Sequence, residues 1–122
     1  MATIELTKDN FVDTINKNEI TLVDLWAAWC GPCQRFGPIF EAASERHKDV
    51  VFAKLDTEQE QELSAALEVT AIPTLMMFKQ GVLIFRQAGL MRGSDLDQLV
   101  KQAKELDIEA ALKEAEEQAG KE

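Results

Sequence analysis

The chain has 122 residues, of which 46% are hydrophobic and 29% are charged, an ordinary balance for one globular domain that argues against wholesale disorder. Its 13 basic and 22 acidic side chains give a net charge of −9, which disfavours binding to nucleic acid or to an anionic membrane. No apolar run approaches the roughly 20 residues that span a bilayer, and the N-terminus lacks a signal-peptide pattern. We therefore expect a cytoplasmic location.

The first half of the sequence alternates between strand-like and helix-like patterns. The expected elements are a strand at residues 3–6, a helix to about residue 17, a strand at 20–26 and a helix from 31 to about 48. Thr7 or Asp9 can cap the first helix. The strand at 20–26 is apolar on both faces, which is typical of a central strand covered by helices. The residues that share the apolar face of the second helix are Phe36, Phe40, Ala43 and His47.

The second half of the sequence predicts a hairpin and a further helix. The expected elements are a strand at residues 50–55, a helix at about 59–67, strands at 74–79 and 82–87, and a helix that starts at Ser94 with the capping-box-like pattern SDLD. Gln80 and Gly81 form a two-residue hairpin turn between the last two strands. The core face of the last helix carries Leu96, Leu99, Val100 and Ala103. This order predicts an α/β fold with a mixed sheet.

The C-terminal end departs from the helix that precedes it. The apolar phase slips after Leu106, which predicts a break near Asp107 and a short extra helix that ends near Gly120. Its apolar face would carry Ile108, Ala111, Leu112 and Ala115. Residues 94–122 hold 9 acidic and 4 basic side chains, and two interpretations of this acidity stay open: a solvated helical surface or an acidic docking surface.

The two cysteines, Cys30 and Cys33, form a C-x-x-C motif. This motif has three common interpretations: a redox dithiol, half of a zinc site, or a structural disulfide. Zinc needs four ligands, and the other soft ligand available is His47, so a second chain would have to contribute. A structural disulfide across so short a loop removes little entropy from the unfolded chain and is unstable in a reducing cytosol. The redox interpretation is therefore favoured.

The position of the motif supports redox chemistry. Cys30 follows a predicted strand and opens a helix, where unpaired backbone N–H groups and the helix dipole favour a thiolate. Pro32 occupies an early helical position, where its missing N–H costs nothing. Cys33 lies in the first turn, where its sulfur should be shielded. We expect Cys30 to attack a partner disulfide and Cys33 to resolve the mixed disulfide.

The sequence around this motif resembles that of thioredoxins. The matching segments are VDLWAAWCGPC at residues 23–33 with Pro38 following, AKLD at 53–56, AIPT at 71–74, FKQG at 78–81, and Gly89. The resemblance covers about residues 2–106. It implies a five-stranded mixed β-sheet flanked by helices on both faces, a thioredoxin domain at 1–106, and an acidic helical extension at 107–122. Pro38 predicts a kink inside the helix.

The resemblance also implies roles for particular residues. Cys30 would be the nucleophile and Cys33 the resolving thiol, and Pro73 would be a cis proline packed against them. The backbone of Ile72 would pair with an extended substrate segment. The docking patch would consist of Trp29, Gly31, Pro32, Ile72, Pro73 and Gly89. Trp26 is interpreted as a core residue.

Asp24 is an acid within an apolar run, and from the residues alone two interpretations stay open: a buried carboxyl group whose pKa is raised, or a solvated aspartate at a strand end. The resemblance implies a buried Asp24 paired with Lys54, and we expect Asp24 to take the proton of Cys33 during resolution. Two positions depart from the family pattern. Gln34 replaces the Lys or Arg that often follows the second cysteine, which would weaken support for the Cys30 thiolate. Gly37 before Pro38 should loosen the kink.

The resemblance implies a cytoplasmic, monomeric protein-disulfide reductase without a bound cofactor, whose redox centre is the Cys30–Cys33 disulfide. An NADPH-dependent thioredoxin reductase would recharge it, and electron transport and redox homeostasis would be its roles. Ribonucleotide reductase, peroxiredoxin and methionine sulfoxide reductase are the substrate types implied. The Gly-Pro pair between the cysteines is similar to that of reducing members. Two alternatives remain: a redox-independent binding subunit on the same fold, and a more oxidising oxidase or isomerase.

Overall fold

Five strands form one mixed sheet in the computed structural model, which describes residues 2–120. The elements are β1 (Thr3–Glu5), α1 (Phe11–Lys17), β2 (Ile20–Trp26), α2 (Gly31–Arg46), β3 (Val51–Asp56), α3 (Gln61–Ala66), β4 (Thr74–Lys79), β5 (Val82–Ala88), α4 (Gly93–Glu105) and α5 (Ile108–Ala119). The strand order is β1-β3-β2-β4-β5. The first three of these run parallel, whereas β4 and β5 pair antiparallel with their neighbours. The predicted α/β fold with a mixed sheet is confirmed.

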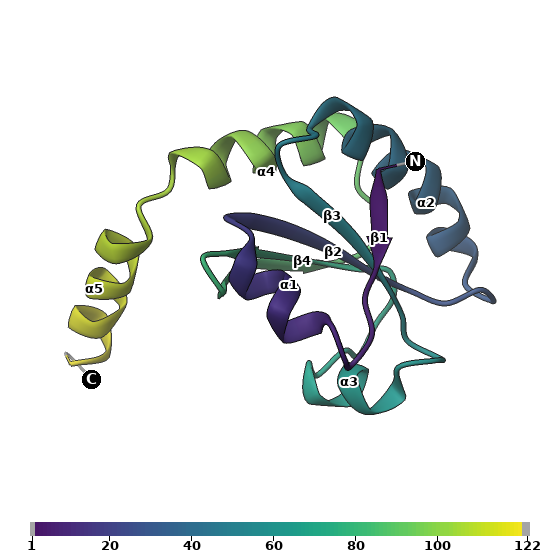
Figure 1. Ribbon diagram of the computed structural model, residues 1–122, viewed down its shortest axis with the longest axis horizontal. Coiled ribbons are helices and arrows are strands. Elements are labelled where there is room, and N and C mark those ends of the chain that lie inside the picture. The colour runs from purple at the N-terminus through teal and green to yellow at the C-terminus, as the bar shows by residue number, and fades with distance from the viewer. Residues whose placement is uncertain (1, 121–122) are drawn as a thin grey trace.

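Helices cover both faces of the sheet (Figure 1). Leu22 of β2 packs with residues of α2 and α4 in one buried cluster. Its neighbour Val23 packs with residues of α1 in the other cluster, against which Leu63 of α3 is also packed. This division follows from the two-residue period of a strand, which sends alternate side chains to opposite faces. Because both faces are covered, β2 is buried from Ile20 to Leu25, as its apolar sequence predicted.

Several helices begin or end a few residues away from the predicted positions. The prediction that Thr7 or Asp9 caps α1 is wrong, because α1 begins at Phe11 with Asn10 at its N-cap. The Asn10 side chain instead accepts a hydrogen bond from the Thr7 backbone N–H at 2.7 Å. Local turn hydrogen bonds of this kind compete with helix caps. The predicted helices to residues 48 and at 59–67 are likewise about two residues too long at their ends.

The start of α4 also differs by one residue. The helix begins at Gly93 rather than at Ser94, and Arg92 occupies the N-cap. The backbone N–H of Arg92 donates to Oδ2 of Asp95 at 3.1 Å. The capping box thus forms between Arg92 and Asp95, two residues earlier than the Ser94–Asp97 pair that the sequence pattern indicated. The hairpin turn is as predicted, since Gln80 and Gly81 both adopt positive φ angles of 52° and 79°, which a tight two-residue turn requires.

The predicted break after α4 is confirmed. Asp107 caps α5, because its Oδ1 accepts a hydrogen bond from the Ala110 backbone N–H at 3.0 Å. Ile108 is buried, but Leu112 on the same predicted apolar face is 46% exposed. The helix stands apart from the sheet in Figure 1, so its apolar face is only partly covered. Among residues 2–120, none of the helices is long and apolar enough to cross a membrane.

Candidate active site

Cys30 and Cys33 are joined by a disulfide bond at the start of α2. Cys30 is the N-cap of this helix, and its Sγ accepts a hydrogen bond from the Cys33 backbone N–H at 3.2 Å. Each cysteine is only 4% exposed. The same N–H and the helix dipole would stabilise negative charge on Cys30 once the bond is reduced. Within residues 2–120 no cluster of three or more potential metal ligands occurs.

The loop before β4 lies directly against the disulfide. The Ile72–Pro73 peptide bond is cis, and the Ile72 carbonyl oxygen lies 3.7 Å from Cys30 Sγ. The carbonyl of Pro73 accepts a hydrogen bond from the Gly89 backbone N–H at 2.8 Å. The structure therefore brings Ile72, Pro73 and Gly89 from two different loops to one side of the cysteines.

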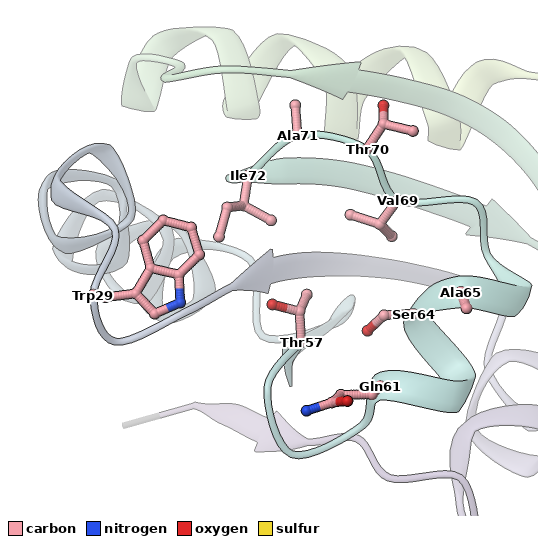
Figure 2. Close-up of a pocket in the computed structure, with 9 residues that line it drawn as sticks. All are labelled: Trp29, Thr57, Gln61, Ser64, Ala65, Val69, Thr70, Ala71 and Ile72. Atoms are coloured by element: carbon pink, nitrogen blue, oxygen red, sulfur yellow. The ribbon is translucent and has the colours of Figure 1, made fainter.

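An open groove begins beside the disulfide at Trp29 and Ile72. The Trp29 side chain is 71% exposed, and its Nε1–H donates to Oε1 of Glu58 at 2.7 Å. The groove has a volume of about 360 Å³, and its lining residues are Trp29, Thr57, Gln61, Ser64, Ala65, Val69, Thr70, Ala71 and Ile72. Figure 2 shows the Trp29 ring and Ile72 at one end and the α3 side chains at the other. This groove has room for an extended segment that runs from α3 to Ile72, the residue next to the disulfide.

Asp24 is fully buried in β2. Burial raises its pKa from 3.8 to about 7, Lys54 opposes this rise, and repulsion from Glu41 adds to it. Neither carboxylate oxygen has a hydrogen-bond partner. Lys54 is the register partner of Asp24 on β3, and its ammonium lies 5.1 Å from the centre of the Trp26 ring. Asp24 can therefore hold or release a proton near neutral pH.

A family model described as Thioredoxin matches residues 2–105. The chain belongs to the thioredoxin family. The putative thioredoxin 2 of Streptomyces coelicolor is 44% identical over 117 residues, which cover 96% of this chain and 87% of that protein. The alignment leaves fewer residues of this chain uncovered than the 12 that α5 contains, so the similarity extends into this helix.

Solved thioredoxin structures have the same fold. A mutant thioredoxin from Halobacterium salinarum superposes with a TM-score of 0.80 at 31% identity, over 86% of this chain and 93% of that one. A chain from a study of the thiol resolving mechanism in yeast mitochondrial 1-Cys peroxiredoxin, via glutathione and thioredoxin systems, gives a TM-score of 0.76. Its identity is 29%, over 83% of this chain and 95% of that one. Family and cysteine pair together support thiol–disulfide oxidoreductase chemistry.

The remaining predicted positions of this thioredoxin lie around the disulfide or along α2. Trp26 is half-buried rather than fully in the core, and it packs on the cluster that contains both cysteines. Pro38 lies within α2, which continues through it to Arg46. Gly31 and Pro32 are exposed beside the cysteines.

His47 is a rim residue and takes no part in the site. Its Nε2 lies 2.6 Å from Oδ1 of Asp97, and its ring stacks on Phe52 with a centroid separation of 6.3 Å.

Two charged residues near the site were not predicted from the sequence. Glu58 holds the Trp29 indole, and Glu41 acts on Asp24 from α2. A signal for Glu58 does exist: it follows the end of β3, and the carboxyl ends of the parallel strands β2 and β3 meet at the same sheet edge. Glu41 has no comparable signal, because its helical position does not show which strand residue it faces.

Proposed function

We propose that this thioredoxin reduces protein disulfides by dithiol–disulfide exchange. The observation that carries the proposal is the Cys30–Cys33 disulfide at the N-terminus of α2, next to Pro73 and an open groove. A nucleophilic sulfur at a helix N-terminus is stabilised as the thiolate. The groove supplies room for a protein substrate beside that sulfur.

The proposed reaction begins with reduced cysteines. The Cys30 thiolate attacks one sulfur of the substrate disulfide, which forms a mixed disulfide and releases the first substrate thiolate. Cys33 then attacks the Cys30 sulfur, which releases the second substrate thiolate and leaves the Cys30–Cys33 disulfide. Two electrons pass to the substrate. A thioredoxin reductase returns the protein to its dithiol form with electrons from NADPH.

Asp24 is the proposed proton acceptor in the second step. Cys33 must lose its proton before it can attack, and a base with a pKa near the working pH performs this transfer best. The Asp24 pKa of about 7 meets that requirement. Lys54, its partner across the strands, would stabilise the carboxylate before the transfer.

The substrate would dock as an extended segment along the backbone of Ile72, with Trp29, Gly31, Pro32 and Gly89 around it. The substrate classes proposed are ribonucleotide reductase, methionine sulfoxide reductase and peroxiredoxin. Peroxiredoxin is also named for the structural neighbour from yeast. We place this activity in the reducing environment of the cytoplasm, where dithiols persist, carried out by a monomer without a bound cofactor.

A redox titration tests the proposed direction of electron flow. The chain has 2 tryptophans and no tyrosine, so fluorescence in dithiothreitol buffers reports on Trp26 and Trp29 near the sulfurs. We expect a two-electron transition at about −270 mV, the value typical of thioredoxins. A potential tens of millivolts more oxidising would indicate an oxidase or isomerase. The absence of a transition would rule out the redox function.

Trapping the intermediate tests the proposed division of labour between the cysteines. A Cys33→Ser variant treated with a thionitrobenzoate disulfide should hold a stable mixed disulfide, because the resolving thiol is missing. The matched Cys30→Ser variant should form much less, since Cys33 lies inside the first turn of α2. Equal capture by both variants would contradict the assignment of Cys30 as the nucleophile.

A further inference from the structure

Glu41 is a half-buried acid on α2 to which the proposed mechanism gives no role. Its Oε1 accepts a 2.6 Å hydrogen bond from the Thr3 hydroxyl of β1. Its Oε2 is buried without a hydrogen-bond partner. A partly buried carboxylate with one tethered and one unpaired oxygen is costly, so its position calls for a physical explanation.

The face of α2 that carries Glu41 also carries Cys33. Cys33, Gly37 and Glu41 follow one another at intervals of four residues, which places them in one row along the helix. A Cβ added to Gly37 would lie 3.7 Å from Lys54 Nζ. The Lys54 ammonium therefore lies opposite the middle of this row, and the missing side chain at Gly37 leaves room for it.

The sheet presents a matching row of charges to the same side. In register, Glu5 of β1 pairs with Lys54 of β3, and Lys54 pairs with Asp24 of β2. Asp24 lies two residues after Leu22, which packs in the cluster with α2 and α4, so strand alternation turns Asp24 toward α2 as well. Lys54 thus lies between Glu5 and Asp24 in the sheet register, and Glu41 of α2 lines the same cavity as Lys54.

A cavity connects this group to solvent. It has a volume of about 410 Å³ and is lined by Thr3, Ile4, Glu5, Trp26, Glu41, Lys54, Asp56 and Gln59. Asp24 is buried behind this lining. The charged groups that surround Asp24 are therefore Lys54 and, beyond it, Glu5 and Asp56 on the sheet, with Glu41 on the helix.

We propose that Glu41, held by Thr3, is a positioning residue that competes with Asp24 for the Lys54 ammonium. It thereby sets the pH at which Asp24 can accept the proton of Cys33. The inference rests on the proposed function for its consequence in catalysis. The arrangement itself does not depend on that function, and repulsion from Glu41 already contributes to the raised pKa of Asp24.

The direct test is a carboxyl ¹³C NMR titration of Asp24 in the oxidised protein. Glu41→Gln keeps an oxygen for the Thr3 hydroxyl but removes the charge, so the Asp24 midpoint should move to lower pH. Glu45→Gln removes the same charge from an exposed position one turn later on α2 and should leave the midpoint in place. Equal midpoints in wild type and Glu41→Gln, or equal shifts in both variants, would overturn the proposal.

A second pair of variants tests the tether. Thr3→Val removes the hydroxyl that holds Glu41 and leaves every charge present, whereas Thr3→Ser keeps a hydroxyl. The midpoint should fall in Thr3→Val and stay at the wild-type value in Thr3→Ser. An unchanged midpoint in Thr3→Val would show that Glu41 needs no tether, which contradicts the proposed positioning.

Stopped-flow reaction of the reduced protein with a thionitrobenzoate disulfide measures the catalytic consequence. The second thionitrobenzoate release reports the attack of Cys33 on the mixed disulfide. In Glu41→Gln this rate at pH 6 should rise about two-fold for each 0.3 unit that the midpoint falls, without a rise at high pH, because Asp24 becomes a weaker base. Structural damage would lower the rate at every pH. Absence of any second release in wild type would refute the function instead.

Discussion

The raised pKa of Asp24 makes the stability of the folded protein depend on pH. Between its usual value of 3.8 and about 7, the folded state keeps a proton that the unfolded state releases. Stability is therefore highest below about pH 4 for this group and falls as the pH rises through 7. Asp24→Asn removes this titration. The free energy of unfolding of the variant, relative to that of wild type, should therefore increase by at most about 3 kcal/mol from pH 5 to pH 8.

Urea unfolding of the oxidised proteins at pH 5 and pH 8 measures this difference. The oxidised form is suitable because cysteines in a disulfide do not titrate. Asp9→Asn, at an exposed position before α1, serves as the control and should give the same difference from wild type at both pH values. Parallel behaviour of Asp24→Asn and wild type would mean that Asp24 keeps an ordinary pKa in the folded state.

At the scale of single residues, the sequence predicts those site residues that lie within one continuous segment. Asp24, Trp29, Cys30 and Cys33 all fall within ten residues, and their relative positions follow from one strand, one turn and the start of one helix. Glu41 reaches the site from two turns further along α2. Its hydrogen bond to Thr3 joins residues 38 apart. Such long-range contacts depend on tertiary packing, which no local pattern encodes.

At the scale of elements, the strands and the hairpin could be predicted, whereas the helix starts could not. Strand identity rests on several apolar residues in succession, as in β2, and one neighbour cannot change it. A helix start rests on a single hydrogen bond. The N-cap residues are Asn10 in α1 and Arg92 in α4, rather than the residues that the sequence predicted. The competing geometries differ by about 1 kcal/mol, too little for sequence patterns to resolve.

Lys79 joins β4 to the end of α4 and provides a test at this scale. This buried residue donates from Nζ to the carbonyl oxygens of Ala103 at 2.7 Å and Leu106 at 2.6 Å. These carbonyls lie at the negative end of the helix dipole, where a cation is favourable. Lys79→Met keeps the apolar stem but removes both of these hydrogen bonds, and the Ala103 carbonyl keeps only its bond from the Leu106 backbone N–H. The substitution should cost roughly 2 kcal/mol.

Urea unfolding measures that cost, with Lys101→Met as the matched control on the exposed face of α4. The control should stay within about 0.5 kcal/mol of wild type, as exposed substitutions usually do. The two variants should retain the same redox potential, because Lys79 lies at the end of β4 that is remote from Pro73 and the disulfide, and Lys101 lies on the exposed face of α4. Equal stability of both variants would show that Lys79 contributes no net stabilisation as a cap.

At the scale of the whole molecule, residues 107–122 form an acidic extension that lies outside the family match. The family match ends at residue 105, before α5 begins. Figure 1 shows α5 at the opposite end of the molecule from the start of α2, where the disulfide lies. Residues 107–122 contribute 6 acidic and 2 basic side chains. We therefore expect the extension to be an acidic surface that the disulfide chemistry does not require.

Deletion of residues 107–122 should leave the thioredoxin domain folded and redox-active. Its net charge would change from −9 to −5. Ile108 is the only residue of α5 classed as buried, and the loss of its burial should cost about 2 kcal/mol. The Lys79 contact to Leu106 is retained, so the end of α4 stays capped. Urea unfolding and the dithiothreitol titration of the truncated protein should therefore show slightly lower stability and an unchanged potential. Loss of cooperative unfolding would instead make α5 part of the domain core.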